Sequence, residues 1–186
     1  MINFLKRRKV LKMGLTGAAA GIVASVAGIL PASARETIGY TISIKNSHTG
    51  ETFNGVYRVG GYYVPRAFRQ INHIMRDHRT GDLHPIDPRL VDILAKMQKR
   101  CDCSEPLTIL SGYRCPSTNA ALRKVSHNVA RNSFHMKGQA ADIRVPGSST
   151  AQVHEVAMSM RAGGVGYYPR RSFVHVDTGD VRHWTA

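Results

Sequence analysis

The stretch from Ser133 to Asp142, SFHMKGQAAD, places a histidine and a carboxylate seven positions apart, with small residues between them. Zinc accepts imidazole nitrogen and carboxylate oxygen, and a catalytic zinc usually takes three protein ligands and leaves a fourth position for water. Small residues between His135 and Asp142 let the backbone fold back, so that both side chains can reach one ion. This pair alone is weak evidence for a metal, because a chain with nine histidines produces such spacings by chance.

A third ligand is expected on a rigid element further along the chain. His175 lies in the stretch FVHVD, residues 173–177, whose alternating pattern is typical of a β-strand. Alternation along a strand places His175 and Asp177 on the same face. A metal held there would lower the pKa of a water molecule, and a neighbouring carboxylate could accept the proton as general base.

The other histidines have simpler explanations as solvated or structural residues. Five of them fall in turns or on expected helix faces, namely His48, His73, His78, His84 and His154. His127 lies near the end of an expected helix, where it could serve only as a charge partner of the helix C-terminus.

Four motifs follow one another in the second half of the chain: SGYR at 111–114, S-x-H-x-x-G-x-A-x-D at 133–142, GVGYYP at 164–169 and FVHVDTG at 173–179. In this order they resemble the D-alanyl-D-alanine carboxypeptidase/murein endopeptidase family of zinc peptidases, peptidase family M15. Within that family the chain is most similar to the exported murein endopeptidases of the YcbK/MepK type. The resemblance covers nearly all of residues 35–186.

The resemblance implies a role for each matching residue. His135, Asp142 and His175 match the zinc ligands, so the implied cofactor is Zn²⁺. Arg114 matches an arginine that orients or polarises the substrate, where it could stabilise the oxyanion at the scissile carbonyl. Ser133 is expected to hydrogen-bond the substrate or a ligand side chain.

The chain departs from many members of the family at the position of the general base. No acid or histidine stands among residues 171–174, just before the third ligand. Asp177 is therefore assigned as general base by elimination. It could instead orient a ligand histidine without touching the substrate, and His183 is a second candidate for the base. Tyr167, Tyr168 and Trp184 are expected to pack in the core, with a substrate groove as the alternative.

The first 34 residues predict an export signal of the twin-arginine type. Arg7-Arg8 precede an uncharged apolar run from Met13 to Leu30, and Pro31-Ala32-Ser33-Ala34 is typical of a cleavage site. A transmembrane anchor is the alternative, because the apolar run is long enough to span a bilayer. Cleavage after Ala34 would leave residues 35–186 as one periplasmic zinc peptidase domain with no stable membrane span.

The charge of that domain indicates anionic partners. The chain has 26 basic and 12 acidic residues, and five of the basic ones lie in the signal, so the domain keeps 21 against 12, a net charge of +9. Such a charge favours cell-wall polymers or anionic lipid surfaces, although a solvated surface explains it equally well. Three cysteines, Cys101, Cys103 and Cys115, allow one disulfide from Cys115 to either of the others.

Residue patterns predict an α+β fold with a small antiparallel sheet, flanking helices and the zinc site on the sheet. Helices are expected from Pro65, from Pro88 after an Asp87 cap, from a Ser117 or Thr118 cap, and from a Ser149 or Thr150 cap to the glycine pair at 163–164. Strands are expected at 40–44, 52–64 with a break at Gly60-Gly61, 107–110, 143–145, 165–168, 173–177 and 182–184.

These observations lead to one preferred function and two alternatives. The preferred function is a zinc-dependent murein endopeptidase that hydrolyses amide bonds in peptidoglycan stem peptides or crosslinks. A cell-wall-binding or scaffold module with a relic zinc site is the first alternative. A secreted nucleic-acid binder would rest on charge alone, and no motif supports it, so no nucleic-acid partner is expected.

Overall fold

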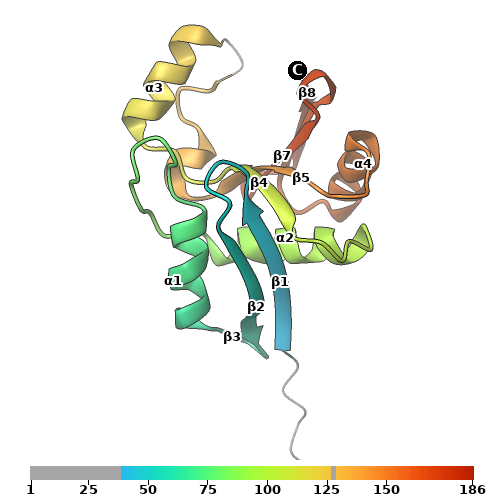
Figure 1. Ribbon diagram of the computed structural model, residues 1–186. Helices are drawn as coiled ribbons and strands as arrows, with labels where there is room; N and C mark the ends of the chain where they lie inside the picture. The colour runs from blue at the N-terminus through green and yellow to red at the C-terminus, as the bar shows by residue number, and fades with distance from the viewer. Residues whose placement is uncertain (1–38, 127–128) are drawn as a thin grey trace, which may run out of the picture. The chain divides into compact units, whose positions relative to one another are not determined.

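The computed structural model describes residues 39–126 and 129–186, which form a mixed eight-stranded sheet in the order β3-β2-β1-β4-β5-β7-β6-β8 (Figure 1). The expected export signal at 1–34 and His127 lie outside the described residues. Within the described ranges, no helix has the length and apolar character needed to cross a membrane.

The strands are β1 (Gly39–Asn46), β2 (Thr52–Val59), β3 (Tyr62–Tyr63), β4 (Leu107–Ser111), β5 (Ala140–Arg144), β6 (Gly164–Tyr168), β7 (Phe173–Asp177) and β8 (Arg182–Thr185). The helices are α1 (Pro65–Ile74), α2 (Pro88–Arg100), α3 (Pro116–Val125) and α4 (Thr150–Met160), with short 3₁₀ turns η1 (Phe134–Lys137) and η2 (Pro169–Arg171). Every expected helix and strand is present, with some boundaries shifted.

Local signals explain where the helices begin. The Asp87 side chain accepts a hydrogen bond from the backbone N–H of Arg89 at the start of α2, as predicted. Ser149 and Gln152 form a capping box at the start of α4. The predicted N-cap of α3, Ser117 or Thr118, was wrong by two or three residues, because Cys115 is the N-cap and its sulfur accepts from the N–H of Thr118. Helix α4 ends at Arg161 in a left-handed conformation, before the glycine pair that was expected to stop it.

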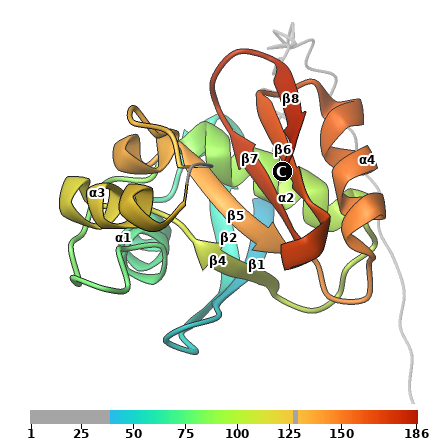
Figure 2. The same cartoon turned by 90° about the horizontal axis from the view of Figure 1, so that it is seen from above.

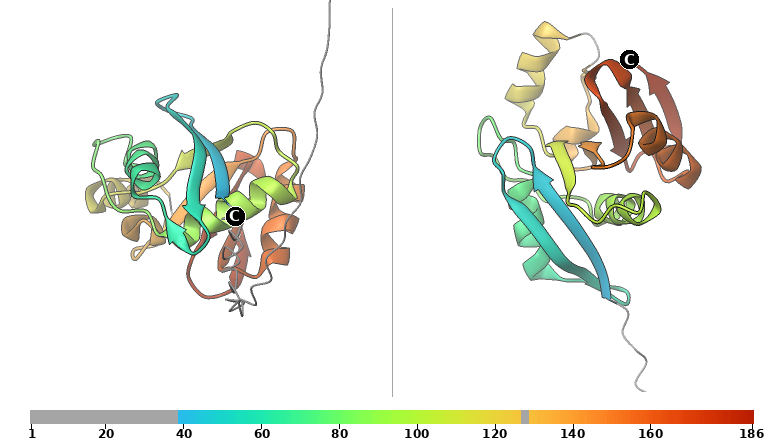
Figure 3. Two further views of the ribbon diagram at one scale, coloured as in Figure 1. Left: turned by 90° about the horizontal axis from the view of Figure 1, so that it is seen from below. Right: turned by 45° about the vertical axis from the view of Figure 1, so that its right-hand side comes forward.

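The sheet is larger than the small antiparallel sheet predicted, and it is mixed. β1 pairs in parallel with β4, and β6 pairs in parallel with β8. Helices α1 and α2 lie between β3 and β4 in the chain, and they supply the long crossover that a parallel pair requires. Figure 3 shows α1 beside the β1–β2 hairpin, and α2 next to α4.

Strand alternation gives the C-terminal strands β5, β7 and β6 two different faces. One face is apolar and contributes Ile143, Val174 and Val176 to the core, where α4 packs on β6 and β7. The opposite face carries Asp142 and His175, which are direct partners across the β5–β7 pair. In Figure 2, α3 and α4 lie on opposite sides of these strands. The candidate site therefore lies on the face of the sheet turned away from α4.

The cysteines do not form the expected disulfide. All three are free, and Cys115 is buried at the start of α3 with its sulfur next to Ser117 and Thr118. The thiol of Cys103 instead donates to the carbonyl oxygens of Glu105 and Pro146. The prediction was wrong because the thiols of Cys115 and Cys103 make hydrogen bonds in two different parts of the fold.

The buried carboxylate of Asp77 holds the segment that leads from β4 to α3. Its two oxygens accept hydrogen bonds from the backbone N–H groups of Cys115 and Arg79, each at 2.9 Å. Burial acts to raise the pKa of Asp77, but hydrogen bonds from Thr118, Cys115 and Arg79 lower it to about 2. Because this pKa lies below the usual value of 3.8, the charged carboxylate stabilises the fold above pH 4.

We predict that Asp77→Asn lowers the free energy of unfolding by about 2 kcal/mol at pH 7, measured by urea denaturation. The difference from wild type should shrink as the pH falls from 4 through 2, because the carboxylate becomes protonated in the folded state. Asp82→Asn changes an exposed carboxylate in the same loop and serves as control. A constant difference at all pH values would contradict the role given to the charge.

Candidate active site

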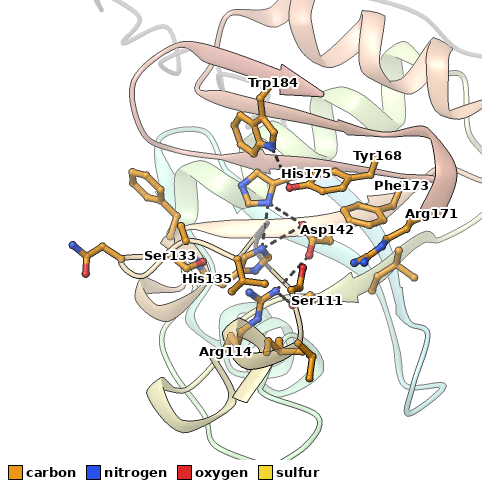
Figure 4. A pocket seen from close by; sticks show the side chains of 18 of the residues that line it. Ser111, Arg114, Ser133, His135, Asp142, Tyr168, Arg171, Phe173, His175 and Trp184 are labelled. Carbon is orange, nitrogen blue, oxygen red and sulfur yellow. Dashed lines mark hydrogen bonds and ion pairs between the residues drawn. The ribbon is translucent and has the colours of Figure 1, made fainter. Parts of the chain in front are cut away.

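His135, Asp142 and His175 come together in one cluster, in which the two histidines are buried and Asp142 is partly buried (Figure 4). His135 Nε2 lies 3.2 Å from His175 Nδ1 and 3.3 Å from Asp142 Oδ1, and His175 Nδ1 lies 2.8 Å from the same oxygen. The three residues come from η1, β5 and β7, so the sheet and one short turn position all of them. Among the described residues this is the one group of three or more such side chains that could hold a metal ion.

Hydrogen bonds from outside the cluster orient both histidine rings. The carbonyl oxygen of Gly112 lies 2.7 Å from His135 Nδ1, which must therefore be the protonated, donating nitrogen. Asp177 Oδ2 lies 3.1 Å from His175 Nε2, and Asp142 Oδ1 lies 2.8 Å from Nδ1 of the same ring, so each nitrogen of His175 faces a carboxylate. Burial acts to lower the pKa of His175, but its hydrogen bonds to Asp142 and Asp177 raise it. A metal bound at His175 Nδ1 would replace the proton there and leave the Nε2 proton bonded to Asp177.

This arrangement fits a divalent cation. Two imidazole nitrogens and a carboxylate oxygen converge on one point, where a cation would take the place of the protons between them, and each donor type suits zinc. Burial lowers the pKa of His135, which favours the neutral ring that a metal requires. Despite burial, His135 and His175 hold the pKa of Asp142 well below its usual range, so it stays ionised.

Asp177 lies behind His175 with no exposed side-chain surface. Its Oδ1 accepts from the N–H groups of Gly164 and Gly179, and its Oδ2 accepts from His175. The guanidinium of Arg182 donates to both oxygens, at 3.0 and 2.7 Å. Burial acts to raise the pKa of Asp177, but the bonds to His175 and Arg182 keep it well below its usual range. Asp177 thus holds one ring of the cluster from the side opposite Asp142.

Arg114 lies on the other side of Asp142. Its Nη2 is 3.6 Å from Asp142 Oδ2 and donates to the hydroxyl of Ser111, and its Nη1 donates to the side chain of Asn119. The backbone N–H of Arg114 also donates to the carbonyl of His135. Arg114 is buried, and its Nε has no hydrogen-bond partner in the structure. A ligand in the adjacent cavity could provide the missing acceptor.

The residues between the first two ligands form a tight turn and the start of a strand. The hydroxyl of Ser133 accepts from the N–H of His135 and caps η1. Gly138 ends the turn with φ of 65°, and a Cβ there would lie 2.2 Å from the carbonyl oxygen of Pro85. The chain then enters β5, where Ala140 and Ala141 are fully buried. The prediction that small residues let the chain fold back between His135 and Asp142 is confirmed.

His183 lies away from the cluster, although sequence reasoning kept it as a second candidate for the base. It pairs with Val165 across the β6–β8 ladder, while its neighbour Trp184 lines the cavity. Because side chains alternate along a strand, His183 lies on the face of the sheet opposite to that of Trp184. Other histidines also have local roles as stacking partners: His48 with His78, His84 with Tyr113, and His154 with Tyr167.

Sequence reasoning missed Asn119, Arg182 and the carbonyl of Gly112. Gly112 belongs to the SGYR motif, and its carbonyl could not be recognised because any residue has one. Arg182 was assigned only to a strand, and its ion pair with Asp177 depends on the pairing of β8 with β6. No sequence signal distinguishes these residues from ordinary surface or helix residues.

A cavity of about 410 Å³ opens beside the cluster. It is lined by the three predicted ligands, by aromatic residues of β6, β7 and β8, and by four arginines: Arg79, Arg114, Arg171 and Arg182. A buried two-histidine, one-carboxylate cluster at the wall of a basic cavity defines a candidate metal-dependent hydrolase.

Comparison with known proteins gives the family. The model of the M15 peptidase family described as "Peptidoglycan L,D-endopeptidase MepK" matches residues 34–184. The chain is 41% identical over 182 residues to the peptidoglycan L,D-endopeptidase MepK of Escherichia coli K12, with 96% of each chain covered. It is 36% identical over 188 residues to a probable peptidoglycan L,D-endopeptidase MepK of Haemophilus influenzae, with 98% of each covered. The chain belongs to this family of M15 peptidases, and the resemblance found in its motifs is confirmed.

We predict that the chain binds one Zn²⁺ and that binding stabilises it. Zinc at a hundred times its dissociation constant should add about 2.7 kcal/mol to the free energy of unfolding, seen as a rise in Tm. His135→Ala and His175→Ala should abolish both the rise and the zinc content.

His183→Ala is the matched control, because His183 lies on the far face of the sheet. It should bind zinc like wild type. Zinc binding that survives in both ligand variants would show that this cluster is not the metal site.

Proposed function

We propose that this chain is an exported zinc peptidase that hydrolyses an amide bond of peptidoglycan, of the L,D type named for its relatives. The observation that supports this best is the convergence of His135 Nε2, His175 Nδ1 and Asp142 Oδ1 on one point at the wall of a cavity. A bound zinc ion would supply Lewis-acid chemistry at that point.

The arginines of the cavity suit an anionic substrate. The stem peptides of peptidoglycan carry free carboxylates, and guanidinium groups bind carboxylates with paired hydrogen bonds. Arg114 is the arginine closest to the ligand cluster, since it reaches Asp142. We assign to it the orientation of the substrate carbonyl and stabilisation of the charge that develops on its oxygen. Ser133 stays a predicted substrate contact, because this residue lines the same cavity.

We assign Asp177 the orienting role that the sequence left as its alternative, rather than that of the general base. Three observations support the choice: its side chain is not exposed, both of its oxygens are occupied, and it does not line the cavity. A base must reach the proton that it removes. A carboxylate bonded to the outer nitrogen of a ligand histidine fixes the ring and raises its basicity.

The proposed site of action is the periplasm. Residues 1–34 would direct export by the twin-arginine route, which the Arg7-Arg8 pair and the site after Ala34 support. Peptidoglycan lies outside the cytoplasm, so export and substrate agree. A scaffold with a relic site is not favoured, because a relic would be expected to lose a ligand or its outer partner, and this chain keeps them all.

We predict that residues 35–186 with zinc release soluble peptides from purified peptidoglycan, and that His135→Ala reduces the rate more than a hundredfold. Arg114→Lys should lower kcat about a hundredfold because one placed donor is lost. Arg123→Lys, an exposed change on α3, should leave kcat unchanged. A wild-type protein that holds zinc but releases nothing would support the scaffold instead.

Asp177→Asn separates the two roles of that residue. An orienting role predicts that zinc affinity falls about 10- to 100-fold, and that saturating zinc restores most of the activity. Zinc titration followed by rate measurement at saturation checks this. An inactive variant with full zinc content and unchanged affinity would restore Asp177 as the general base.

Export is tested by fusing residues 1–34 to a reporter that is active only outside the cytoplasm. Arg7→Lys with Arg8→Lys should abolish reporter activity, because the twin-arginine route requires the pair. Lys9→Arg keeps the charge and the pair, and should have no effect. Export that persists without the arginine pair would contradict the twin-arginine assignment.

A further inference from the structure

Tyr168 and Trp184 reach the cavity from β6 and β8, although sequence reasoning expected both to pack in the core. Tyr167 does turn away from the cavity, and its ring stacks on His154 of α4 at 4.7 Å. Tyr168 and Trp184 line the cavity, and the Trp184 ring lies 5.2 Å from the ring of His175. In Figure 4 the hydroxyl end of Tyr168 points toward His175.

The hydrogen bond between these two residues has only one direction. Trp184 Nε1 can only donate, so the Tyr168 hydroxyl accepts this bond, at 3.0 Å. The proton of the hydroxyl then remains for a second acceptor. Residues 39–126 and 129–186 provide no such acceptor, and the hydroxyl lies at the cavity wall beside the ligand cluster.

Packing on two sides holds this hydroxyl in place. The Phe173 ring stacks on the Tyr168 ring at 4.3 Å with an interplanar angle of 12°. Trp184 lies over Gly166, its partner across the β6–β8 pair, and a Cβ at that position would come within 2.6 Å of the indole. A side chain at residue 166 would displace the indole, so glycine allows Trp184 to reach Tyr168. A donor held by its surroundings needs little reorganisation when charge develops nearby.

Hydrolysis of an amide requires donors at the carbonyl oxygen. When the oxygen of water bonds to the carbonyl carbon, negative charge moves to the carbonyl oxygen, and it returns when the C–N bond breaks and the amine leaves with a proton. Arg114 is one donor at this cavity, and the Tyr168 hydroxyl is a second that also lines it.

Resting on the proposed function, we propose that the Tyr168 hydroxyl is a catalytic hydrogen-bond donor to the oxygen of the scissile carbonyl, and that Trp184 is the positioning residue that directs it. Tyr168 keeps its proton throughout and forms no covalent bond with the substrate. Trp184 acts only through Tyr168. Its Nε1–H donates to the Tyr168 oxygen, so the hydroxyl proton is directed away from the indole and into the cavity.

The test compares Tyr168→Phe with wild type in the zinc-loaded domain. This change removes only the hydroxyl and keeps the stack on Phe173. We expect kcat on peptidoglycan peptides to fall 10²- to 10³-fold, as for loss of one oxyanion donor, with KM changed less than threefold. Zinc affinity and Tm should match wild type. Tyr167→Phe removes a hydroxyl from the opposite face and should leave kcat unchanged.

A second readout does not depend on turnover. A phosphinate isostere of the cleaved bond presents an anionic oxygen where the oxyanion would form, and its affinity should fall in Tyr168→Phe by about the same factor as kcat/KM. Trp184→Phe should lower kcat about tenfold, yet it should add nothing in the Tyr168→Phe background, because the two residues act as a unit.

The outcomes separate this proposal from the proposed function. Active wild type with a fully active Tyr168→Phe variant would overturn the role of Tyr168 alone. An undiminished effect of Trp184→Phe in the double variant would overturn the role of Trp184. A wild-type protein with zinc but no activity on peptidoglycan would overturn both the function and the proposal.

Discussion

The site depends on the way two imidazole rings are held. The Nδ1 of His135 donates to the Gly112 carbonyl, and the Nε2 of His175 bonds to Asp177. The inner nitrogens, His135 Nε2 and His175 Nδ1, lie beside the ionised carboxylate of Asp142. A carboxylate and two imidazole nitrogens gathered away from water favour positive charge at this point, which a metal ion would supply.

The sheet fixes the relative positions of the predicted metal ligands. Asp142 and His175 are direct partners across an antiparallel pair, so the register of β5 with β7 sets the distance between two ligands. A slip of β5 by one residue would turn Asp142 toward the α4 side of the sheet, away from His175. The third ligand, His135, comes from a short turn, and it depends on hydrogen bonds to the segment after β4. Loop and sheet are therefore coupled at the metal-binding point.

Each carboxylate near this point is also balanced by an arginine further out. Arg182 pairs with Asp177 on one side, and Arg114 approaches Asp142 on the other. Asp177 of the first pair has no exposed side-chain surface and does not line the cavity, whereas both members of the second pair line it. Asp177 can therefore orient a ligand histidine, while the region around Asp142 and Arg114 remains open to a substrate.

Much of this could be predicted from the sequence, because strand alternation and cap residues are local signals. These signals predicted β7 and α2, and they placed His175 and Asp177 on the same face of β7. The mixed sheet could not be predicted, since the parallel pairing of β1 with β4 depends on how α1 and α2 cross over. The buried state of Asp177 also depends on long-range contacts, as does the position of Trp184 over Gly166. Motif resemblance predicted which three side chains would form the cluster, but it could not say which ring nitrogens face the metal.

The most direct test of the proposed metal site is a crystal structure of the zinc-loaded domain with anomalous scattering at the zinc edge. We predict one zinc bound by His135 Nε2, His175 Nδ1 and an Asp142 oxygen, at about 2.0–2.2 Å, with Asp177 still bonded to His175 Nε2. Zinc bound through His175 Nε2, or coordinated directly by Asp177, would contradict this prediction.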